Sequence, residues 1–234
     1  MRSWPALSVA PIDGWLWRYA SGGSLRANSV ATLAYTGRDL EGAIARAEGH
    51  YRVRGAASRF TITPVSEPAG LDDLLAARGY AQGDEHVTML KPVAHRPAAP
   101  PEVSLSSEPE RGWLAVYLAG LTADRVTVAP SILERLPPRR VFLACRRAGE
   151  VVGSGLCVAD GRVASVQCMA TSADQRRRGC ARAVLAAIEA WAAGQGCTHL
   201  YLQAERANRP AIALYASFGF GIAGTYHVRQ KRAP

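Results

Sequence analysis

Residues 175–181, Gln-Arg-Arg-Arg-Gly-Cys-Ala, place three arginines and a glycine directly before a predicted helix. The first turn of a helix has backbone N–H groups without partners and a partial positive charge, so anions bind there. Gly179 lets a phosphate come close to the main chain, and Ala181 keeps the next approach narrow. Arg176 and Arg178 add positive charge. A ligand that carries a diphosphate would suit this turn, although an ordinary solvated helix start uses the same residue types.

A second chemically informative segment, residues 208–220, follows a strand-like run at 200–202. Asn208 can cap a helix, and it lies seven residues before Tyr215, about two helical turns, so both side chains can face one way. A tyrosine with its ordinary pKa of about 10 stays protonated near neutral pH and can donate a proton to a leaving group. A lone tyrosine on an apolar helix is more often a core residue, and only the surrounding pattern raises Tyr215 above that expectation.

Together the two segments resemble the GCN5-related N-acetyltransferase (GNAT) superfamily. Its R-x-x-G-x-A phosphate loop is matched by Arg176, Gly179 and Ala181. Its N-x-x-A…L-Y-x-x-x-G-F element is matched by Asn208, Ala211, Leu214, Tyr215, Gly219 and Phe220. The order and the spacing both fit, and the resemblance covers residues 103–234.

The resemblance implies an α/β (α+β) chain with the acyl-CoA N-acyltransferase fold, a mixed central sheet flanked by helices. It implies acetyl-CoA as co-substrate, no metal, and an amine of a small molecule or a peptide as acceptor. The amine would attack the thioester directly within a ternary complex. A non-catalytic acyl-CoA-binding or sensing module is the alternative, because the family often places a glutamate on the strand before the loop and Gln167 stands there.

The resemblance also assigns roles to residues. The backbone N–H of Met169 would bind the developing oxyanion, Tyr215 would protonate the leaving thiolate, and Glu205 is the candidate base. Tyr226, His227, a water chain or an acceptor that arrives neutral are the alternatives to Glu205. The residues that would bind the cofactor are Met169, Thr171, Arg176, Arg178, Gly179, Cys180, Ala181 and Asn208.

The elements that must position these residues follow in the order of that fold. Strands are expected at 103–106, 140–145, 151–159, 163–169, 200–203 and 222–230, and helices at 111–120, 131–136, 182–193 and 210–218. Asp160 and Gly161 predict a hairpin turn. One apolar face of the helix after the loop is formed by Val184, Leu185, Ile188 and Trp191.

The N-terminal part carries a weak repeat. Gly79 and Gly219 lie 140 positions apart in similar contexts, and the same offset relates a helix at 40–53 and a strand at 59–63 to the last helices and strands. At this offset Asp39 replaces the loop glycine and Leu75 replaces Tyr215. We therefore expect residues 1–91 to form a degenerate, non-catalytic GNAT-like half-domain that packs on a catalytic domain at 103–234. A proline-rich linker at 92–102 would join them.

The acceptor pocket is the least predictable part of the sequence, because fold and donor site do not fix the acceptor. We expect the loops between the first helices of residues 103–234 and the N-terminal part to wall it. A polar and aromatic cluster in that part is either pocket lining or ordinary core and surface, and it comprises Trp15, Trp17, Arg18, Arg26 and Asn28.

Composition limits the remaining possibilities. The 234 residues carry a net charge of +9, almost all from scattered arginines, so we do not expect a nucleic-acid partner, although a basic surface keeps that third possibility open. Five cysteines without a C-x-x-C pair indicate neither a zinc site nor a disulfide framework. No long apolar run or signal peptide is visible, so we expect a cytoplasmic protein without membrane contact. The sequence does not distinguish a monomer from a homodimer.

Overall fold

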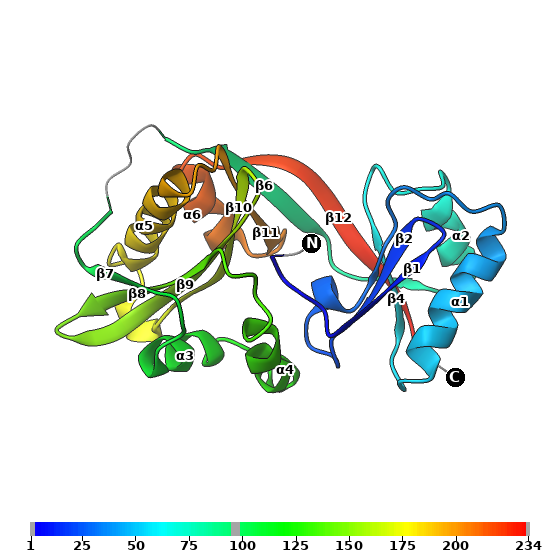
Figure 1. Cartoon of the computed structure of the whole chain (residues 1–234), viewed down its shortest axis with the longest axis horizontal. Coiled ribbons are helices and arrows are strands. Elements are labelled where there is room, and N and C mark those ends of the chain that lie inside the picture. Colours follow the sequence, from blue (N-terminus) through cyan, green and yellow to red (C-terminus); the bar gives the residue numbers. More distant parts are fainter. Residues whose placement is uncertain (1–2, 95–98, 233–234) are drawn as a thin grey trace.

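The computed structural model describes residues 3–94 and 99–232, which build one twelve-stranded sheet flanked by helices. The strands follow the order β1-β2-β3-β4-β12-β6-β11-β10-β9-β8-β7, and β5 pairs with β12 beside this path. Two neighbouring pairs, β3–β4 and β10–β11, are parallel and the others are antiparallel. The mixed sheet expected from the sequence is therefore confirmed. Figure 1 shows two lobes, with β12 running from one into the other.

The strands are β1 Ser8–Ile12, β2 Trp15–Tyr19, β3 Val30–Ala31, β4 Ser58–Ile62, β5 Ala81–Gln82, β6 His86–Pro92, β7 Val103–Ser106, β8 Arg140–Arg147, β9 Glu150–Asp160, β10 Val163–Thr171, β11 His199–Glu205 and β12 Gly221–Lys231. The helices are α1 Leu40–Arg52, α2 Leu71–Ala77, α3 Arg111–Leu118, α4 Ala123–Leu133, α5 Cys180–Gly194 and α6 Arg209–Ser217, with short 3-10 turns η1 Leu25–Ala27 and η2 Ala173–Gln175.

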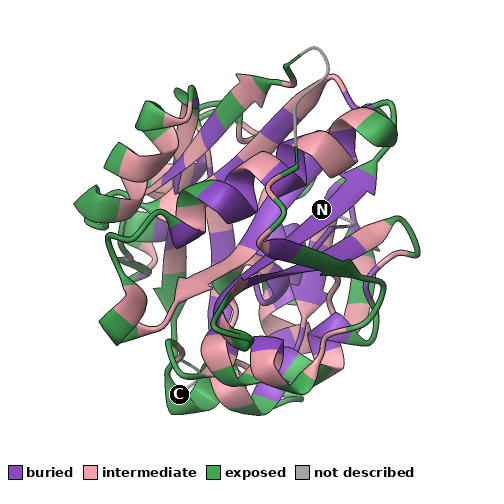
Figure 2. Cartoon of the chain, turned by 90° about the vertical axis from the view of Figure 1, so that its left-hand side faces the viewer, coloured by how far each residue is buried: buried purple, intermediate pink, exposed green. Residues whose placement is uncertain are grey.

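The C-terminal lobe has one apolar core on each face of its sheet. The predicted apolar face of α5 is buried on one side, with Val184 and Ile188 fully enclosed. On the other side Trp113 of α3 packs on Phe142 with ring centroids 5.1 Å apart. Figure 2 shows buried residues concentrated on the strands and the inner faces of the helices. These two cores hold β8 to β11 between α5 and the α3–α4 pair.

The helix expected at 131–136 was wrong in its bounds, because α4 runs over Ala123–Leu133. Pro130 lies inside it, whereas the expected helix begins after that residue. A proline lacks the N–H that would bond four residues back, but α4 continues past it and buries Val128, Ala129 and Ile132. Burial of this face outweighs the lost hydrogen bond.

The N-terminal lobe repeats the strand order of the C-terminal lobe. Its strands β1 to β4 follow each other in the sheet as β8 to β11 do, and β3–β4 is parallel like β10–β11. The first residues of α1 and α5, Leu40 and Cys180, lie 140 positions apart, as Gly79 and Gly219 do. The repeat inferred from the sequence thus coincides with a repeated arrangement of elements. The N-terminal copy has no counterpart of α3 and α4 among the described residues.

The two lobes exchange strands. β6 comes from the N-terminal part of the chain but lies between β11 and β12, with Leu90 opposite Tyr201 on one side and Gly221 on the other. The far end of β12 lies beside β4 of the N-terminal lobe, with Val228 opposite Thr61. Each lobe therefore completes its sheet with a strand from the other part of the chain.

His86 and Tyr226 mark the centre of this exchange. They are 140 positions apart in the sequence, they are register partners in the β6–β12 pair, and their rings stack with centroids 4.9 Å apart. A residue and its repeat equivalent thus meet at a local two-fold axis. The expected division into residues 1–91, 92–102 and 103–234 stays a prediction about folding units, and residues 95–98 of the linker lie outside the described residues.

A buried ion pair holds β6 against the C-terminal lobe. Lys91 of β6 bonds Glu189 of α5, and both side chains are largely buried. The same Glu189 oxygen accepts the backbone N–H of Ala94 at 2.7 Å. The Lys91 ammonium also lies 5.3 Å from the ring centroid of Phe218, at the end of α6. One carboxylate thus ties together β6, α5 and the chain that leaves β6.

We expect the two parts to stay together after the connection between them is cut. A protease site inserted between Ala99 and Pro100 would separate β6 from β7 covalently, but β6 would remain paired on both edges and the end of β12 would remain beside β4. Gel filtration of the cleaved protein without denaturant should show one species of unchanged size. Two separate fragments would contradict the strand exchange.

The Glu189→Gln substitution should destabilise the protein by about 3–5 kcal/mol, because it leaves the buried Lys91 charge without a carboxylate. Urea unfolding measures the loss. Glu134→Gln, at an exposed residue without an ion pair in the described chain, is the control. The Lys91→Met, Glu189→Gln double variant should recover part of the stability. Equal stability of Glu189→Gln and Glu134→Gln would refute this role.

Candidate active site

The parallel strands β10 and β11 pair over only a short stretch. Their register runs from Val163–His199 to Ser165–Tyr201 and then ends. On its other edge, β10 shifts register against β9 between Gln167 and Ala170. From Gln167 onward, therefore, the edge of β10 that faces β11 has no strand partner in the described parts of the chain. Backbone N–H and C=O groups on such an edge can pair with an extended ligand.

A bulge at Cys168 causes this change. Its φ is 52°, in the left-handed region that non-glycine residues rarely adopt. Gln167 bonds Ser165 on the α3–α4 face, and Cys168 packs in the core on that same face. Met169 then turns to the opposite core, beside α5. The side chain of Met169 fills the core, as the sequence analysis allowed, and its main chain lies on the unpaired stretch.

The loop before α5 leaves a run of amides unpaired. Within the described residues, no backbone or side-chain acceptor takes the N–H groups of residues 177–182, and α5 has no side-chain cap. Gly179 has a φ of 85°, and a Cβ added there would meet no atom within 4 Å. Arg177 also has a positive φ of 62°. With these two positive φ values, the loop presents a run of N–H donors at the positive end of a 15-residue helix.

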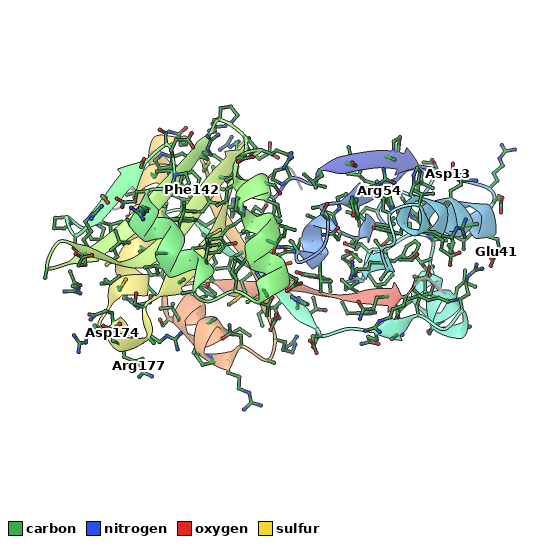
Figure 3. The ribbon with its side chains drawn as sticks, turned by 90° about the horizontal axis from the view of Figure 1, so that it is seen from below. Asp13, Glu41, Arg54, Phe142, Asp174 and Arg177 are labelled. Carbon is green, nitrogen blue, oxygen red and sulfur yellow. The ribbon has the colours of Figure 1, made fainter. Side chains whose placement is uncertain are left out.

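The side chains of the loop lie where the sequence analysis placed positive charge. Arg176 and Arg178 are both exposed, and neither has an ion pair in the described chain. Arg147 of β8 donates to the Arg178 carbonyl at 3.0 Å and so connects the loop to β8. In Figure 3, Asp174 and Arg177 project outward from this end of the molecule.

Cys180 is buried behind the loop rather than displayed on it. A Cβ on Gly153 of β9 would lie 2.1 Å from its sulfur, so a glycine is required there. Cys180 therefore contributes its backbone N–H to the unpaired run and its side chain to the core. Ala181, the next residue, is half-buried.

Helix α6 carries Asn208 and Tyr215 as expected. The Asn208 side chain accepts the N–H of Ala211 at 3.2 Å, so it is the N-cap of α6. The Tyr215 ring packs on Phe220 with centroids 6.0 Å apart, and it borders the core that also contains Met169. Its hydroxyl makes no hydrogen bond within residues 3–94 and 99–232, and burial raises the pKa of Tyr215 to about 12. Tyr215 is thus a protonated phenol with a free donor.

The candidate bases are dispersed. Glu205 is exposed at the end of β11 and forms no ion pair among the described residues. Tyr226 is buried on the neighbouring β12, and burial raises its pKa, so it is a poor base near neutral pH. His227 lies beside Ile62 in the N-terminal lobe and bonds Asp72 at 2.9 Å. The geometry therefore favours Glu205 over His227.

The N-terminal end of the chain lies on the α3–α4 face of β10 and β11. The Gln167 amide donates to the Ser3 carbonyl at 2.7 Å, and the Ser3 hydroxyl bonds the Tyr201 hydroxyl at 2.6 Å. Trp4 is buried beside Tyr117. In Figure 1 the N-terminus accordingly lies between the two lobes. A residue pattern alone does not reveal this contact, because it joins positions more than 160 apart.

The polar and aromatic cluster of the N-terminal part is mostly structural. Trp15 and Trp17 are each 1 % exposed in the core of that lobe, and Asn28 and Arg18 are buried with backbone partners. Arg26 alone reaches β11, where it donates to Gln203 at 3.5 Å. In the sequence, this polar face of β11 is indicated only by the alternation of Tyr201, Gln203 and Glu205.

Residues 3–94 and 99–232 contain no helix that is both long and apolar enough to cross a membrane. In the same residues no three His, Cys, Asp or Glu side chains are grouped to hold a metal ion.

Comparison with known proteins agrees with this geometry. Residues 1–229 match the family described as "Probable histone acetyltransferase Rv0428c C-terminal". An "Uncharacterized N-acetyltransferase YobR" of Bacillus subtilis (strain 168) is 30% identical over 240 residues, which cover 98% of this chain and 95% of that protein.

Solved structures share the fold at lower identity. A GCN5-related N-acetyltransferase from Kribbella flavida superposes with a TM-score of 0.73 at 15% identity, over 98% of this chain and 91% of its own. A tandem GNAT protein from the clavulanic acid biosynthesis pathway gives 0.65 at 15% identity, over 88% and 76%. The chain belongs to the Rv0428c C-terminal family, and with it to the GNAT superfamily of acetyltransferases.

Proposed function

We propose that this acetyltransferase moves the acetyl group of acetyl-CoA to the amine of a small molecule or a peptide, by direct attack within a ternary complex. The observation that carries the proposal is the unpaired run of amides at residues 177–182 beside the unpaired edge of β10. The run of amides can bind a diphosphate, and the edge of β10 can pair with an extended amide chain. Coenzyme A contains a diphosphate followed by an extended chain with amide groups.

The residues present fit this co-substrate. The diphosphate would lie on the amides that follow Arg176, with Arg176 and Arg178 supplying charge and Gly179 supplying room. The pantetheine amides would pair with the β10 edge at Met169 and Thr171. Cys180 and Ala181 would donate backbone N–H groups, and Asn208, already the cap of α6, would contact the arm where the helix begins.

The reaction then requires a few events at this chain's own atoms. The amine nitrogen attacks the acetyl carbonyl while the Met169 N–H donates to the developing oxyanion. The C–N bond forms, the C–S bond breaks, and the thiolate takes the proton of the Tyr215 hydroxyl. The amine loses its proton to Glu205 or to water. The tyrosinate left at Tyr215 then takes up a proton from solvent. Holding the reactants in line supplies a further part of the rate.

A non-catalytic acyl-CoA-binding module is the second candidate. The observation that favours it is Gln167, which stands where the resembling family often has a glutamate and whose amide is bonded to Ser3 and Ser165. The carboxamide of Gln167, unlike a carboxylate, cannot accept a proton from an amine near neutral pH. Such a module would bind coenzyme A and gain thermal stability without turnover.

We propose the cytoplasm as the compartment. All five cysteines are unpaired in the structure, and four of them are buried, which suits a reducing environment.

Binding and turnover measurements separate the two candidates. Calorimetry with coenzyme A tests the donor site, and release of free thiol from acetyl-CoA over a panel of amines tests transfer. Binding with amine-dependent thiol release supports the enzyme. Binding without release from any amine supports the second candidate, and absence of binding contradicts both.

The Gly179→Ala substitution should raise the dissociation constant of coenzyme A roughly tenfold or more, because the methyl group enters the run of amides. The strained φ should lower the free energy of unfolding by about 1–2 kcal/mol. Gly70→Ala is a matched control, since Gly70 is the N-cap of α2 with a φ of 80° and equally open surroundings. Equal coenzyme A affinity in both variants would show that the diphosphate does not bind to this loop.

Tyr215→Phe should lower kcat about a hundredfold or more, the usual contribution of a general acid. Coenzyme A affinity and unfolding free energy should change little, because the hydroxyl has no partner in the described chain. Tyr19→Phe in the N-terminal lobe is the control. Full kcat in Tyr215→Phe would exclude this tyrosine as the acid.

The pH dependence follows from the raised pKa of Tyr215. An acid acts in its protonated form, so its contribution is present below a pKa of about 12 and is lost only above it. The rate should therefore rise with pH as the acceptor amine loses its proton, without a falling limb up to about pH 10. A fall between pH 7 and 9, absent from Tyr215→Phe, would contradict the assignment.

A further inference from the structure

The face of the sheet opposite α5 is polar where β10 and β11 separate. Along β11, Leu200 and Leu202 are buried in the α5 core, while Tyr201 and Gln203 bond residues on the other face. By the alternation of a strand, Glu205 continues that polar face. An acceptor that approaches the acetyl group from the side away from α5 meets these side chains.

Arg26 is the cation of this face. It belongs to η1 of the N-terminal lobe, it donates to Gln203 of β11, and its guanidinium lies 5.3 Å from the ring centroid of Trp4. The side chain is half-buried, yet it has no carboxylate within ion-pair distance in residues 3–94 and 99–232. A guanidinium that is oriented by stacking but left without a counter-ion suits an anionic ligand.

The charge of Arg26 acts next to the proposed oxyanion donor. Burial raises the pKa of Cys168 to about 12, and the Arg26 charge opposes that rise. Burial likewise raises the pKa of Tyr226, and the positive charge of Arg26 again opposes this rise. Cys168 immediately precedes Met169, and the hydrogen bond from Arg26 to Gln203 places the guanidinium on β11, so Arg26 faces the separation of β10 and β11 and not only the N-terminal lobe.

A second arginine lies on the same side. Arg125 of α4 lines a small hollow with Trp4, Ser24 and Tyr117, and it is exposed without an ion pair in the described chain. Its charge also opposes the raised pKa of Cys168. The α3–α4 side of the site thus carries two guanidinium groups, those of Arg26 and Arg125, that form no ion pair among residues 3–94 and 99–232.

We propose that the acceptor is a primary amine that also carries an anionic group, a carboxylate or a phosphate, and that Arg26 binds this group. The amine would then lie toward Glu205 and the acetyl carbon. This inference rests on the acetyl transfer proposed above. A lysine-rich peptide would bring further cations against Arg26 and Arg125 in a chain of net charge +9, so the geometry does not favour it.

Matched amines test the acceptor class. Alanine and alaninamide differ in the carboxylate, O-phosphoethanolamine and ethanolamine differ in the phosphate, and a lysine-rich peptide represents cationic acceptors. We expect higher kcat/KM for at least one anionic member than for its neutral partner, and the preferred pair identifies the anion. Equal or better turnover of the neutral amines or of the peptide overturns the inference and leaves the proposed function intact. No turnover of any amine defeats the proposed function itself.

Substitutions at Arg26 test whether this residue binds the anionic group. Arg26→Gln should raise KM for the anionic amine about tenfold to a hundredfold, with little change in kcat or in coenzyme A affinity. Arg26→Lys should restore part of the loss, and Arg125→Gln should have a smaller effect. Arg52→Gln, at an exposed position of α1, removes the same charge elsewhere in the N-terminal lobe and should leave KM unchanged. Equal KM values in Arg26→Gln and Arg52→Gln overturn the assignment, and thermal unfolding checks that each variant is folded.

Discussion

The candidate site depends on the early end of pairing between β10 and β11. Parallel neighbours in a sheet normally bond along their whole overlap, because unpaired backbone groups are costly when they are buried. Here the bulge at Cys168 turns β10 away after Ser165, and the groups beyond it stay available. The amides before α5 and the phenol on α6 are useful only because this edge is open between them. A continuous β10–β11 ladder would leave the same residues without a place for a substrate.

Local chemistry explains which parts of the structure were predictable. The hairpin at Asp160 and Gly161, the start of α5 after Gly179 and the cap by Asn208 depend on residues within a few positions of each other, and each was found. The helix expected at 131–136 was wrong in its bounds, because α4 runs through Pro130, a residue that disfavours a helix interior, and buries Val128 and Ile132. The roles of individual site residues stay predictions.

Non-local pairing could not be predicted in the same way. In the structure β6 has alternating burial along its length, but nothing in residues 86–92 indicates that β11 and β12 are its partners. The same holds for the contact of Ser3 with Gln167 and for the position of Arg26 on the face of β11. These contacts decide which residues surround an acceptor, and for that reason the acceptor was the part that the sequence left open.

The exchange of strands has a consequence for how the protein is made. β6 is synthesised early, but both of its neighbours lie in the last part of the chain, and β4 also waits for the end of β12. The first lobe therefore cannot close its sheet edge until residues 221–231 have been synthesised. Such distant pairings slow folding and leave strand edges exposed in the meantime, which invites association with other nascent chains. A chaperone that covers this edge during synthesis would have its greatest effect on the yield of the whole protein.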